Sequence, residues 1–135
     1  MSEQKNCPFC GNPDMVIKND LAFAHYDSYP VNTGHCLVIT HRHVAGYFQA
    51  TSEEKAAIWA LVDEMKTIID EKHKPDGYNV GVNIGKTAGQ SVPHLHIHMI
   101  PRYEGDMEDP RGGVRGVIPH KQKYMRRTVG HNKVS

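Results

Sequence analysis

The chain has 135 residues, of which 39% are hydrophobic and 23% charged, and its formal net charge is +1 when the histidines are neutral. This length and composition are typical of a single globular domain and exclude a chain that is disordered throughout. A net charge so close to zero gives no overall attraction to nucleic acid or to an anionic membrane, so we expect neither as a partner.

The N-terminal segment MSEQKNC lacks the apolar run of a secretion signal, and no apolar stretch reaches the roughly 18–20 residues that a membrane span requires. We therefore expect a cytoplasmic protein. Two of the three cysteines, Cys7 and Cys10, form a CxxC motif. In a cytoplasmic protein such a pair is usually metal-binding or redox-active.

Three β-strands are expected in the next part of the chain. Residues 15–17 and 21–24 are short apolar stretches, and the polar pair Asn19-Asp20 between them is compatible with a β-hairpin. A turn-rich segment, 27–34, then leads into the run 35–40, whose β-branched residues predict a third strand.

A long helix is expected after Thr51. Thr51 and Glu54 have the spacing of a capping box. Basic residues at 72–74, followed by Pro75-Asp76-Gly77, predict the end of the helix. Apolar residues recur at three- and four-residue spacing between these limits and predict one buried face, formed by Ile58, Leu61, Val62, Met65 and Ile68.

Polar and apolar residues alternate over 78–84, which predicts a fourth strand, and a glycine-rich loop, 85–90, leads into the segment SVPHLHIHMIPR. The tail from Arg102 shows no strong period. Five short strands and one long helix indicate an antiparallel α+β fold. We expect a single domain over residues 1–135, with a core at about 7–115 and a C-terminal arm at 116–135.

The three histidines of SVPHLHIHMIPR alternate with aliphatic residues. Imidazole can act near neutral pH as a nucleophile, a proton carrier or a metal ligand. A two-histidine metal site and a solvated polar face compete with the interpretation as a catalytic row. On a β-strand the alternation places two sets of side chains on opposite faces, His94, His96 and His98 toward a cleft and Leu95, Ile97 and Met99 toward the helix.

The segment GQSVPHLHIHMIPR resembles the signature of the histidine triad (HIT) superfamily, in which three histidines alternate with hydrophobic residues after Gly-Gln-Ser or Gly-Gln-Thr. The resemblance extends from Cys7 to about Arg115 and includes the expected helix and the strands around it. It implies a HIT-like fold and a two-fold homodimer in which two five-stranded sheets join into one sheet of ten strands.

The resemblance also implies roles for individual residues. His96 would attack the α-phosphorus of a nucleotide and form a nucleotidyl-histidine intermediate, which water resolves, while His98 would hydrogen-bond the transferred phosphate. No carboxylate cluster typical of a magnesium site is apparent in the sequence. The remaining implied contacts are Asn83, Gln90 and Ser91 to the phosphate or leaving group, Asp27 to the ribose hydroxyls, and His35 as a supporting residue behind the triad.

The CxxC motif is half of a tetrahedral zinc site. Because the sequence has no second CxxC, the remaining ligands are expected to be histidines, namely His94 and either His43 or His41. Resemblance to a zinc-bearing branch of the superfamily implies a structural zinc held by Cys7, Cys10, His43 and His94. A redox-active CxxC is disfavoured because no strand is expected before Cys7, while a cysteine pair that binds no metal stays open at this point.

The expected function is hydrolysis of dinucleoside polyphosphates, such as diadenosine tetraphosphate, at the α-phosphate. Three further functions compete with it, namely an adenosine phosphoramidate hydrolase, a purine nucleotide-binding module with weak catalysis, and a nucleotidyltransferase that passes the nucleotide to phosphate or a sugar. The complete triad and Ser91 argue against a pure binding module. His98 disfavours the transferase, because relatives with that activity tend to have glutamine at this position.

Overall fold

The computed structural model describes residues 6–11 and 13–124 of the chain. Within these residues, the chain as far as Glu104 forms one compact unit and the chain from Gly105 onward forms another. The division precedes the expected end of the core near residue 115, and the single-domain organisation stays a prediction. The part of the expected C-terminal arm beyond residue 124 lies outside the described residues.

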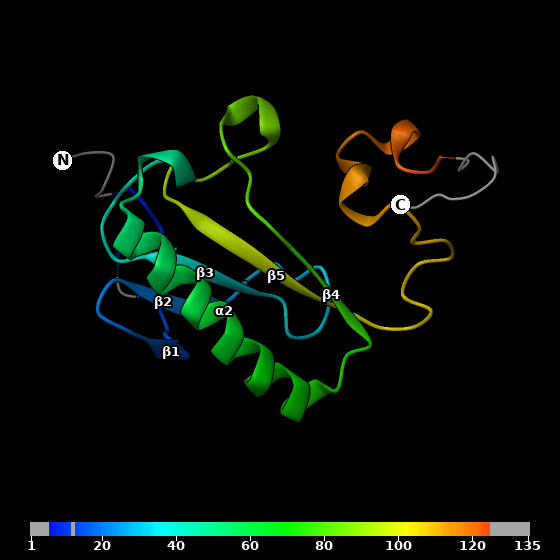
Figure 1. Ribbon diagram of the computed structural model, residues 1–135, viewed down its shortest axis with the longest axis horizontal. Coiled ribbons are helices and arrows are strands. Elements are labelled where there is room, and N and C mark those ends of the chain that lie inside the picture. Colours follow the sequence, from blue (N-terminus) through cyan, green and yellow to red (C-terminus); the bar gives the residue numbers. More distant parts are fainter. Residues whose placement is uncertain (1–5, 12, 125–135) are drawn as a thin grey trace. The chain divides into compact units, whose positions relative to one another are not determined.

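Five strands form one sheet with the order β1-β2-β3-β5-β4 (Figure 1). All neighbouring strands are antiparallel. Together with the long helix α2 (Ser52–His73), this sheet confirms the expected antiparallel α+β fold. The strands are β1 (Ile17–Lys18), β2 (Ala22–Tyr26), β3 (Cys36–Thr40), β4 (Gly77–Gly81) and β5 (His96–Arg102).

The ends of two strands differ from the expected ones because of their partners. β4 ends at Gly81, where its pairing with β5 reaches His98, so residues 82–84 have no partner strand and form a loop. β5 begins only at His96. The N–H of His94 instead donates to the main-chain oxygen of Val92 at 2.8 Å, in a tight turn around Pro93.

Helix α2 begins at the expected capping box. The side chain of Thr51 accepts a hydrogen bond from the N–H of Glu54, and the Glu54 carboxylate accepts one from the N–H of Thr51. The same carboxylate accepts two bonds from the Arg42 guanidinium, at 2.9 and 2.8 Å. These contacts tie the start of the helix to the segment that follows β3.

Helix α2 packs across one face of the sheet (Figure 1), and the core lies between them. Ile69 is fully buried, whereas Val62 and Ile68, both expected on the buried face, are only partly buried. Ile69 continues the four-residue spacing from Met65, while Ile68 lies further round the helix. The aliphatic residues that alternate with the histidines enter this core as expected. The fully buried contributors from α2, from β5 and from the residue before β5 are Ile58, Leu61, Met65, Ile69, Leu95, Ile97 and Met99.

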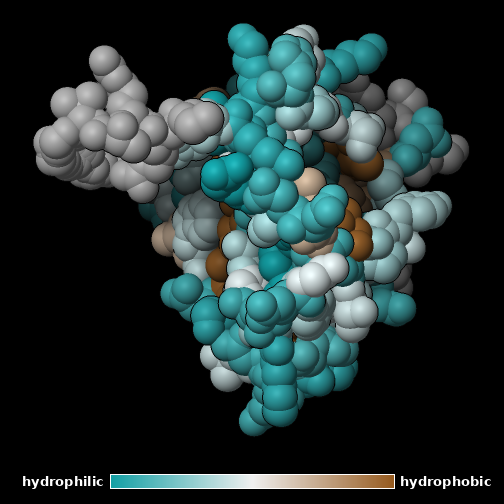
Figure 2. Space-filling model, turned by 90° about the vertical axis from the view of Figure 1, so that its right-hand side faces the viewer, coloured by the Kyte–Doolittle hydropathy of each residue, from teal (hydrophilic) through white to brown (hydrophobic). Residues whose placement is uncertain are grey.

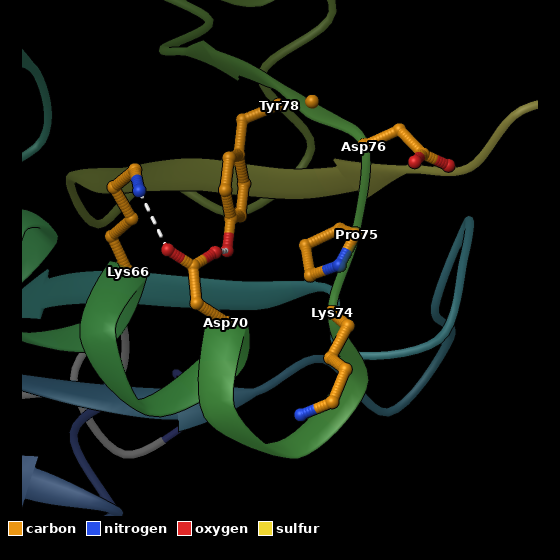
Figure 3. Close-up of a pocket in the computed structure, with 7 residues that line it drawn as sticks. Lys66, Asp70, Lys74, Pro75, Asp76 and Tyr78 are labelled. Atoms are coloured by element: carbon orange, nitrogen blue, oxygen red, sulfur yellow. Dashed lines mark hydrogen bonds and ion pairs between the residues drawn. The ribbon is translucent and has the colours of Figure 1, made fainter.

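The end of α2 and the start of β4 border an open pocket of about 280 Å³, shown in Figure 3. Asp70 is bonded there on both sides. Its carboxylate accepts from Lys66 Nζ and from the Tyr78 hydroxyl, each at 2.6 Å. Burial and the charge of Asp70 raise the pKa of Tyr78. The helix turns into the strand at Lys74, whose φ of 52° ends the helical run.

Among the described residues, no helix has both the length and the apolar character needed to cross a membrane. The face shown in Figure 2 carries mainly hydrophilic residues, with hydrophobic residues confined to small patches between them.

The described part of the C-terminal unit, residues 105–124, contains two short 3-10 helices, η3 (Gly113–Val117) and η4 (Pro119–Lys121). The guanidinium of Arg115 donates to the main-chain oxygens of Lys121 and Gln122, at 3.0 and 3.1 Å. These bonds fold the end of the segment back on its beginning.

Candidate functional site

Strand β5 carries two of the three histidines. His96 and His98 alternate onto one face, and their ring centroids lie 5.2 Å apart. Both are paired with β3, and His98 is also paired with β4, so the sheet fixes their backbone. The prediction that one strand carries all three histidines on one face is wrong for His94. The turn around Pro93 places His94 before β5.

His96 is held as a neutral base. Its Nδ1 lies 2.7 Å from the main-chain oxygen of His94, so Nδ1 carries the proton and donates it. The lone pair therefore lies on Nε2. Burial lowers the pKa of His96, although the hydrogen bond to His94 opposes the shift. At neutral pH the residue is an uncharged imidazole with an available nucleophilic nitrogen.

His98 is oriented by His35, the residue immediately before β3. Nδ1 of His35 accepts the N–H of Val31 at 3.0 Å, so the proton of the neutral imidazole lies on Nε2. That nitrogen is 3.0 Å from Nδ1 of His98 and 3.3 Å from a carboxylate oxygen of Asp27. With the shorter contact to His98, Nδ1 of His98 accepts and its Nε2 carries the proton.

The charge states of these two histidines follow from their surroundings. Burial, and then the neighbouring His96 and His35, lower the pKa of His98 to about 4. Burial also lowers the pKa of His35, against the opposing charge of Asp27. Both imidazoles are therefore neutral at neutral pH, and His98 can offer an N–H without carrying a charge.

A cavity of about 700 Å³ opens onto His96 and His98. This volume is within the range of roughly 300–1,000 Å³ that is usual for small-molecule sites. The other expected site residues on its wall are Asp27, Asn83 and Ser91. Residues that the sequence analysis did not single out form the rest of the wall, namely Pro8, Phe9, Pro13, Asp14, His25, Ser28, Tyr29, Leu37 and Val92.

Two expected site residues do not line the cavity. His35 is buried and touches His98 instead. The Gln90 side chain accepts the N–H of Gly85 at 2.9 Å and donates to the main-chain oxygens of Ala45 and Val92, at 2.6 and 3.1 Å. Gln90 thus closes the loop 85–90, and a direct contact between Gln90 and phosphate stays a prediction.

The four residues expected to bind metal lie together. One ligand atom from each of Cys7, Cys10, His43 and His94 lies within 4.8 Å of the others. Sγ of Cys10 is 3.0 Å from Nδ1 of His43 and 3.4 Å from Nδ1 of His94, and Sγ of Cys7 is also 3.4 Å from Nδ1 of His94. Tetrahedral zinc with bonds of about 2.3 Å to sulfur and about 2.0–2.1 Å to nitrogen needs donors about 3.5 Å apart. The donor set fits this requirement.

The hydrogen bonds around the cluster also suit a metal. Nε2 of His94 lies 2.7 Å from the main-chain oxygen of Thr40, so Nε2 donates and Nδ1 keeps its lone pair facing the cysteines. His41 is engaged elsewhere. Its Nε2 is 3.0 Å from the main-chain oxygen of Asn19, and its ring stacks on Phe23. The structure therefore brings His43, and not His41, into the cluster.

Phe9 and His25 are the cavity residues for which the sequence contains a usable signal. Phe9 lies between two metal-ligand candidates, Cys7 and Cys10. In such a short loop, the positions of the ligands largely determine the position of Phe9. His25 shares the alternation of β2 with Phe23, on the face opposite the helix. Its Nδ1 lies 2.6 Å from the main-chain oxygen of Asp14, which fixes the ring at the cavity wall.

The model of the HIT domain matches residues 12–105. The chain belongs to the HIT family. This membership confirms the resemblance seen in the histidine motif, and the HIT-domain match includes the cavity residues from Pro13 to His98.

Three relatives are similar to the chain in sequence. A HIT-like protein of Mycoplasma pneumoniae is 39% identical over 105 residues, which are 73% of each chain. An AP-4-A phosphorylase of Mycobacterium tuberculosis is 37% identical over 68% of this chain and 48% of its own length. A bis(5'-adenosyl)-triphosphatase of Dictyostelium discoideum is 34% identical over 71% of this chain and 64% of its own length. The chain thus spans less than two thirds of both named enzymes.

Solved structures of HIT proteins share the fold. A HIT family protein from Bacillus anthracis superposes with a TM-score of 0.71 at 34% identity, covering 75% of this chain and 76% of that one. A Zn-bound histidine triad family protein from Mycobacterium smegmatis has a TM-score of 0.69 at 29% identity, with 78% and 81% covered. These similarities confirm the expected HIT-like architecture.

Proposed function

We propose that this HIT-family protein hydrolyses dinucleoside polyphosphates, such as diadenosine tetraphosphate, at the α-phosphate. The observation that carries the proposal is the 2.7 Å hydrogen bond between Nδ1 of His96 and the main-chain oxygen of His94. It leaves the lone pair of Nε2 for attack on phosphorus in the cavity. The nucleophile is uncharged and held by the sheet, which suits covalent catalysis.

The reaction has two steps. Nε2 of His96 forms a bond to the α-phosphorus while the bond from phosphorus to the bridging oxygen breaks, and the other nucleoside phosphate leaves with that bond's electrons. Water then attacks the nucleotidyl-histidine, the Nε2–phosphorus bond breaks, and AMP and a proton are released. His96 returns to its neutral form. Dividing the substitution in this way replaces one difficult step with two easier ones.

The remaining site residues would stabilise the charge that develops on the phosphoryl oxygens. His98 would donate from Nε2, with His35 fixing its orientation, and the side chains of Asn83 and Ser91 line the same cavity. Donors already in place need no reorganisation during the reaction. We assign Asp27 to the ribose hydroxyls, and the loop-closing bonds of Gln90 would hold Ser91 near the phosphate.

The names of two relatives support this substrate class. One is a bis(5'-adenosyl)-triphosphatase and the other is an AP-4-A phosphorylase. The second name favours a further candidate reaction, in which inorganic phosphate instead of water accepts the nucleotide from His96. An assay also has to separate both reactions from adenosine phosphoramidate hydrolysis and from nucleotide binding with weak catalysis.

We infer that the resident metal of the cluster is zinc. The donor set of two thiols and two imidazoles is the type that structural zinc prefers, and the related M. smegmatis structure is described as Zn-bound. Bound there, zinc would cross-link the N-terminal segment to the segments that follow β3 and precede β5. Its part in the reaction would be structural, through the strand that carries His96.

We also propose a homodimer. Among the described residues, β4 is the last strand in the sheet order and pairs with β5 alone, so its outer edge can pair with β4 of a second copy. Such pairing would give the expected ten-stranded sheet, and light scattering during size-exclusion chromatography would test it. The cytoplasmic location and the absence of a nucleic-acid partner stay predictions.

Chromatography of reaction products tests the proposed activity. Diadenosine tetraphosphate should yield AMP and ATP in water, whereas phosphorolysis would yield ADP and ATP when phosphate is added. Adenosine phosphoramidate serves as the parallel substrate. If neither substrate released a nucleotide product, the proposed enzymatic activity would be ruled out.

Two variants test the assignment of the nucleophile. His96→Ala should abolish turnover and keep AMP binding. The matched control is His41→Ala, which removes a histidine outside the cavity and should keep turnover. Turnover near the wild-type rate in His96→Ala would rule out this residue as the nucleophile.

A further inference from the structure

The loop between the two cysteines contributes to two sites at once. Cys7 and Cys10 belong to the Cys/His cluster, which consists of these cysteines with His43 and His94. The two residues between them, Pro8 and Phe9, line the cavity that contains His96. In a loop this short, any movement of the cysteines also moves the two residues between them. The cluster and the cavity are therefore mechanically joined.

Phe9 makes the contacts that join them. Its ring centroid lies 5.8 Å from that of His94 with an interplanar angle of 86°, and 5.1 Å from that of His96 with an angle of 63°. Aromatic rings prefer edge-to-face or offset-stacked arrangements, so these contacts favour one orientation of the Phe9 ring. Phe9 also packs against an apolar group from β2 and β3, which consists of Phe23, Leu37 and Ile39. The ring thus contacts the apolar face of the sheet and both imidazoles.

Apart from the packing of Phe9, the described part of this segment is tied to the rest of the molecule through its cysteine side chains. The described residues 6–11 form turns and belong to neither a helix nor a strand. Their main-chain hydrogen bond, from the N–H of Cys10 to the oxygen of Cys7, is internal to the loop. The cysteine side chains are therefore the points at which the loop is tied to His43 and His94.

We propose that Phe9 makes the nucleotide affinity of the cavity depend on whether the Cys/His cluster holds its metal. The inference rests on the proposed function, because it takes the cavity to be the nucleotide site. A metal bound by the four ligands holds the loop closed, and the closed loop keeps Phe9 against His96 and completes the cavity wall. Without the metal the loop moves away from the sheet, and the wall and the orientation of His96 are lost. Phe9 is a positioning residue in this scheme.

Calorimetric titration with AMP tests the proposal on four samples, the wild type and Phe9→Ala, each zinc-loaded and after chelation. Chelation should weaken AMP binding to the wild type about tenfold. Zinc-loaded Phe9→Ala should show a similar loss while keeping its zinc, and chelation should then have little further effect, since coupled sites are not additive. Phe48→Ala removes an exposed phenylalanine outside the cavity and should behave as the wild type.

A spectroscopic readout separates positioning from general damage to the fold. In nucleotide-free, zinc-loaded protein, the imidazole ¹⁵N signals of His96 should shift in Phe9→Ala, stay unchanged in Phe48→Ala, and return toward wild-type values in Phe9→Tyr, which restores the ring. This comparison needs no metal removal, so it holds even if the chelated chain unfolds.

Two results would overturn the inference. One is an unchanged AMP affinity in zinc-loaded Phe9→Ala, and the other is an equal loss on chelation in the wild type and in Phe9→Ala. Failure of the zinc-loaded wild type to bind AMP at all would be a different result, because it would overturn the proposed function itself.

Discussion

Nε2 of His35 lies 3.0 Å from Nδ1 of His98, and the main-chain N–H of Val31 donates to the other nitrogen of His35. A main-chain N–H is always a donor, so it determines which nitrogen of His35 carries the proton. His35 in turn determines which nitrogen of His98 carries one. The donor that His98 presents in the cavity is therefore specified by the loop before β3, which is far from His98 in sequence but in contact with it.

Replacing His35 with leucine should remove the donor to His98 at similar volume. Because the effect is indirect, we expect kcat for the proposed substrate to fall by roughly tenfold to a hundredfold, less than the ~10²–10³-fold loss on deleting an oxyanion donor itself. The affinity for AMP should change little. His35→Gln, whose amide can still donate, should keep more activity. Steady-state kinetics in which His35→Leu matched the wild type would contradict the relay.

His43→Ala should remove one of the four ligands of the proposed zinc site. We expect zinc well below one equivalent and a lower melting temperature, because structural zinc contributes directly to folding. His41→Ala is the matched control, since His41 lies next to the cluster in sequence and bonds Asn19 instead. Elemental analysis and thermal melts with and without chelator give the comparison, and equal zinc contents in both variants would refute the ligand assignment.

Glu54 should make stability depend on pH in the acid range. Hydrogen bonds from Arg42, supported by those from Thr51, lower the pKa of Glu54 from 4.5 to about 2. Since the folded pKa is below the unfolded one, the ionised group stabilises the fold above about pH 4.5, and this contribution is lost as the pH falls toward 2. We expect about 2 kcal/mol at neutral pH, less than the full shift implies because Arg42 is half exposed.

Urea unfolding of Glu54→Gln measures this contribution. The variant should be less stable than the wild type at pH 7, and the difference should shrink at pH 3. Glu53→Gln, an exposed neighbour in the first turn of α2, should change stability little at either pH. An identical difference between Glu54→Gln and the wild type at both pH values would show that ionisation of Glu54 does not contribute.

Leu61→Ala should destabilise the fold by about 3 kcal/mol, because it removes a fully buried side chain between α2 and the sheet and leaves a cavity. Val62→Ala is the matched control on the partly buried flank of the same helix, and its cost should be smaller. Denaturant unfolding of both variants gives the two values. A larger loss in Val62→Ala than in Leu61→Ala would contradict the burial pattern.

The helix and the sheet were predictable because their signals are local. The capping box at Thr51 and the apolar spacing from Ile58 to Met65 depend only on neighbours in sequence, and the structure contains both features. The place of His94 was not predictable from such signals. Its alternation with Leu95 continues the strand pattern in the sequence. The pairing with β3 nevertheless stops at His96, and this limit depends on the tertiary structure.

The residues of the site likewise include some with local sequence signals and some that depend on tertiary contacts. Its metal ligands could be named because a CxxC motif limits the possible chemistry, yet the choice of His43 over His41 depends on where the end of β3 points. The contact between Val31 and His35 involves a main-chain group, which sequence patterns do not reveal. The position of Phe9 inside the CxxC motif was a usable signal, but its contact with His96 joins segments far apart in the chain.

Strand β5 lies between β3 and β4, so the cavity residues on it, His96 and His98, are held in place by the sheet. Several other cavity residues come from loops and are easier to exchange. Asp27, Asn83 and Ser91 come from loops, where insertions and substitutions disturb the fold least. Grafting loop 83–92 from a relative, with the Val31 loop left unchanged, should therefore alter substrate preference while the histidine chemistry stays in place.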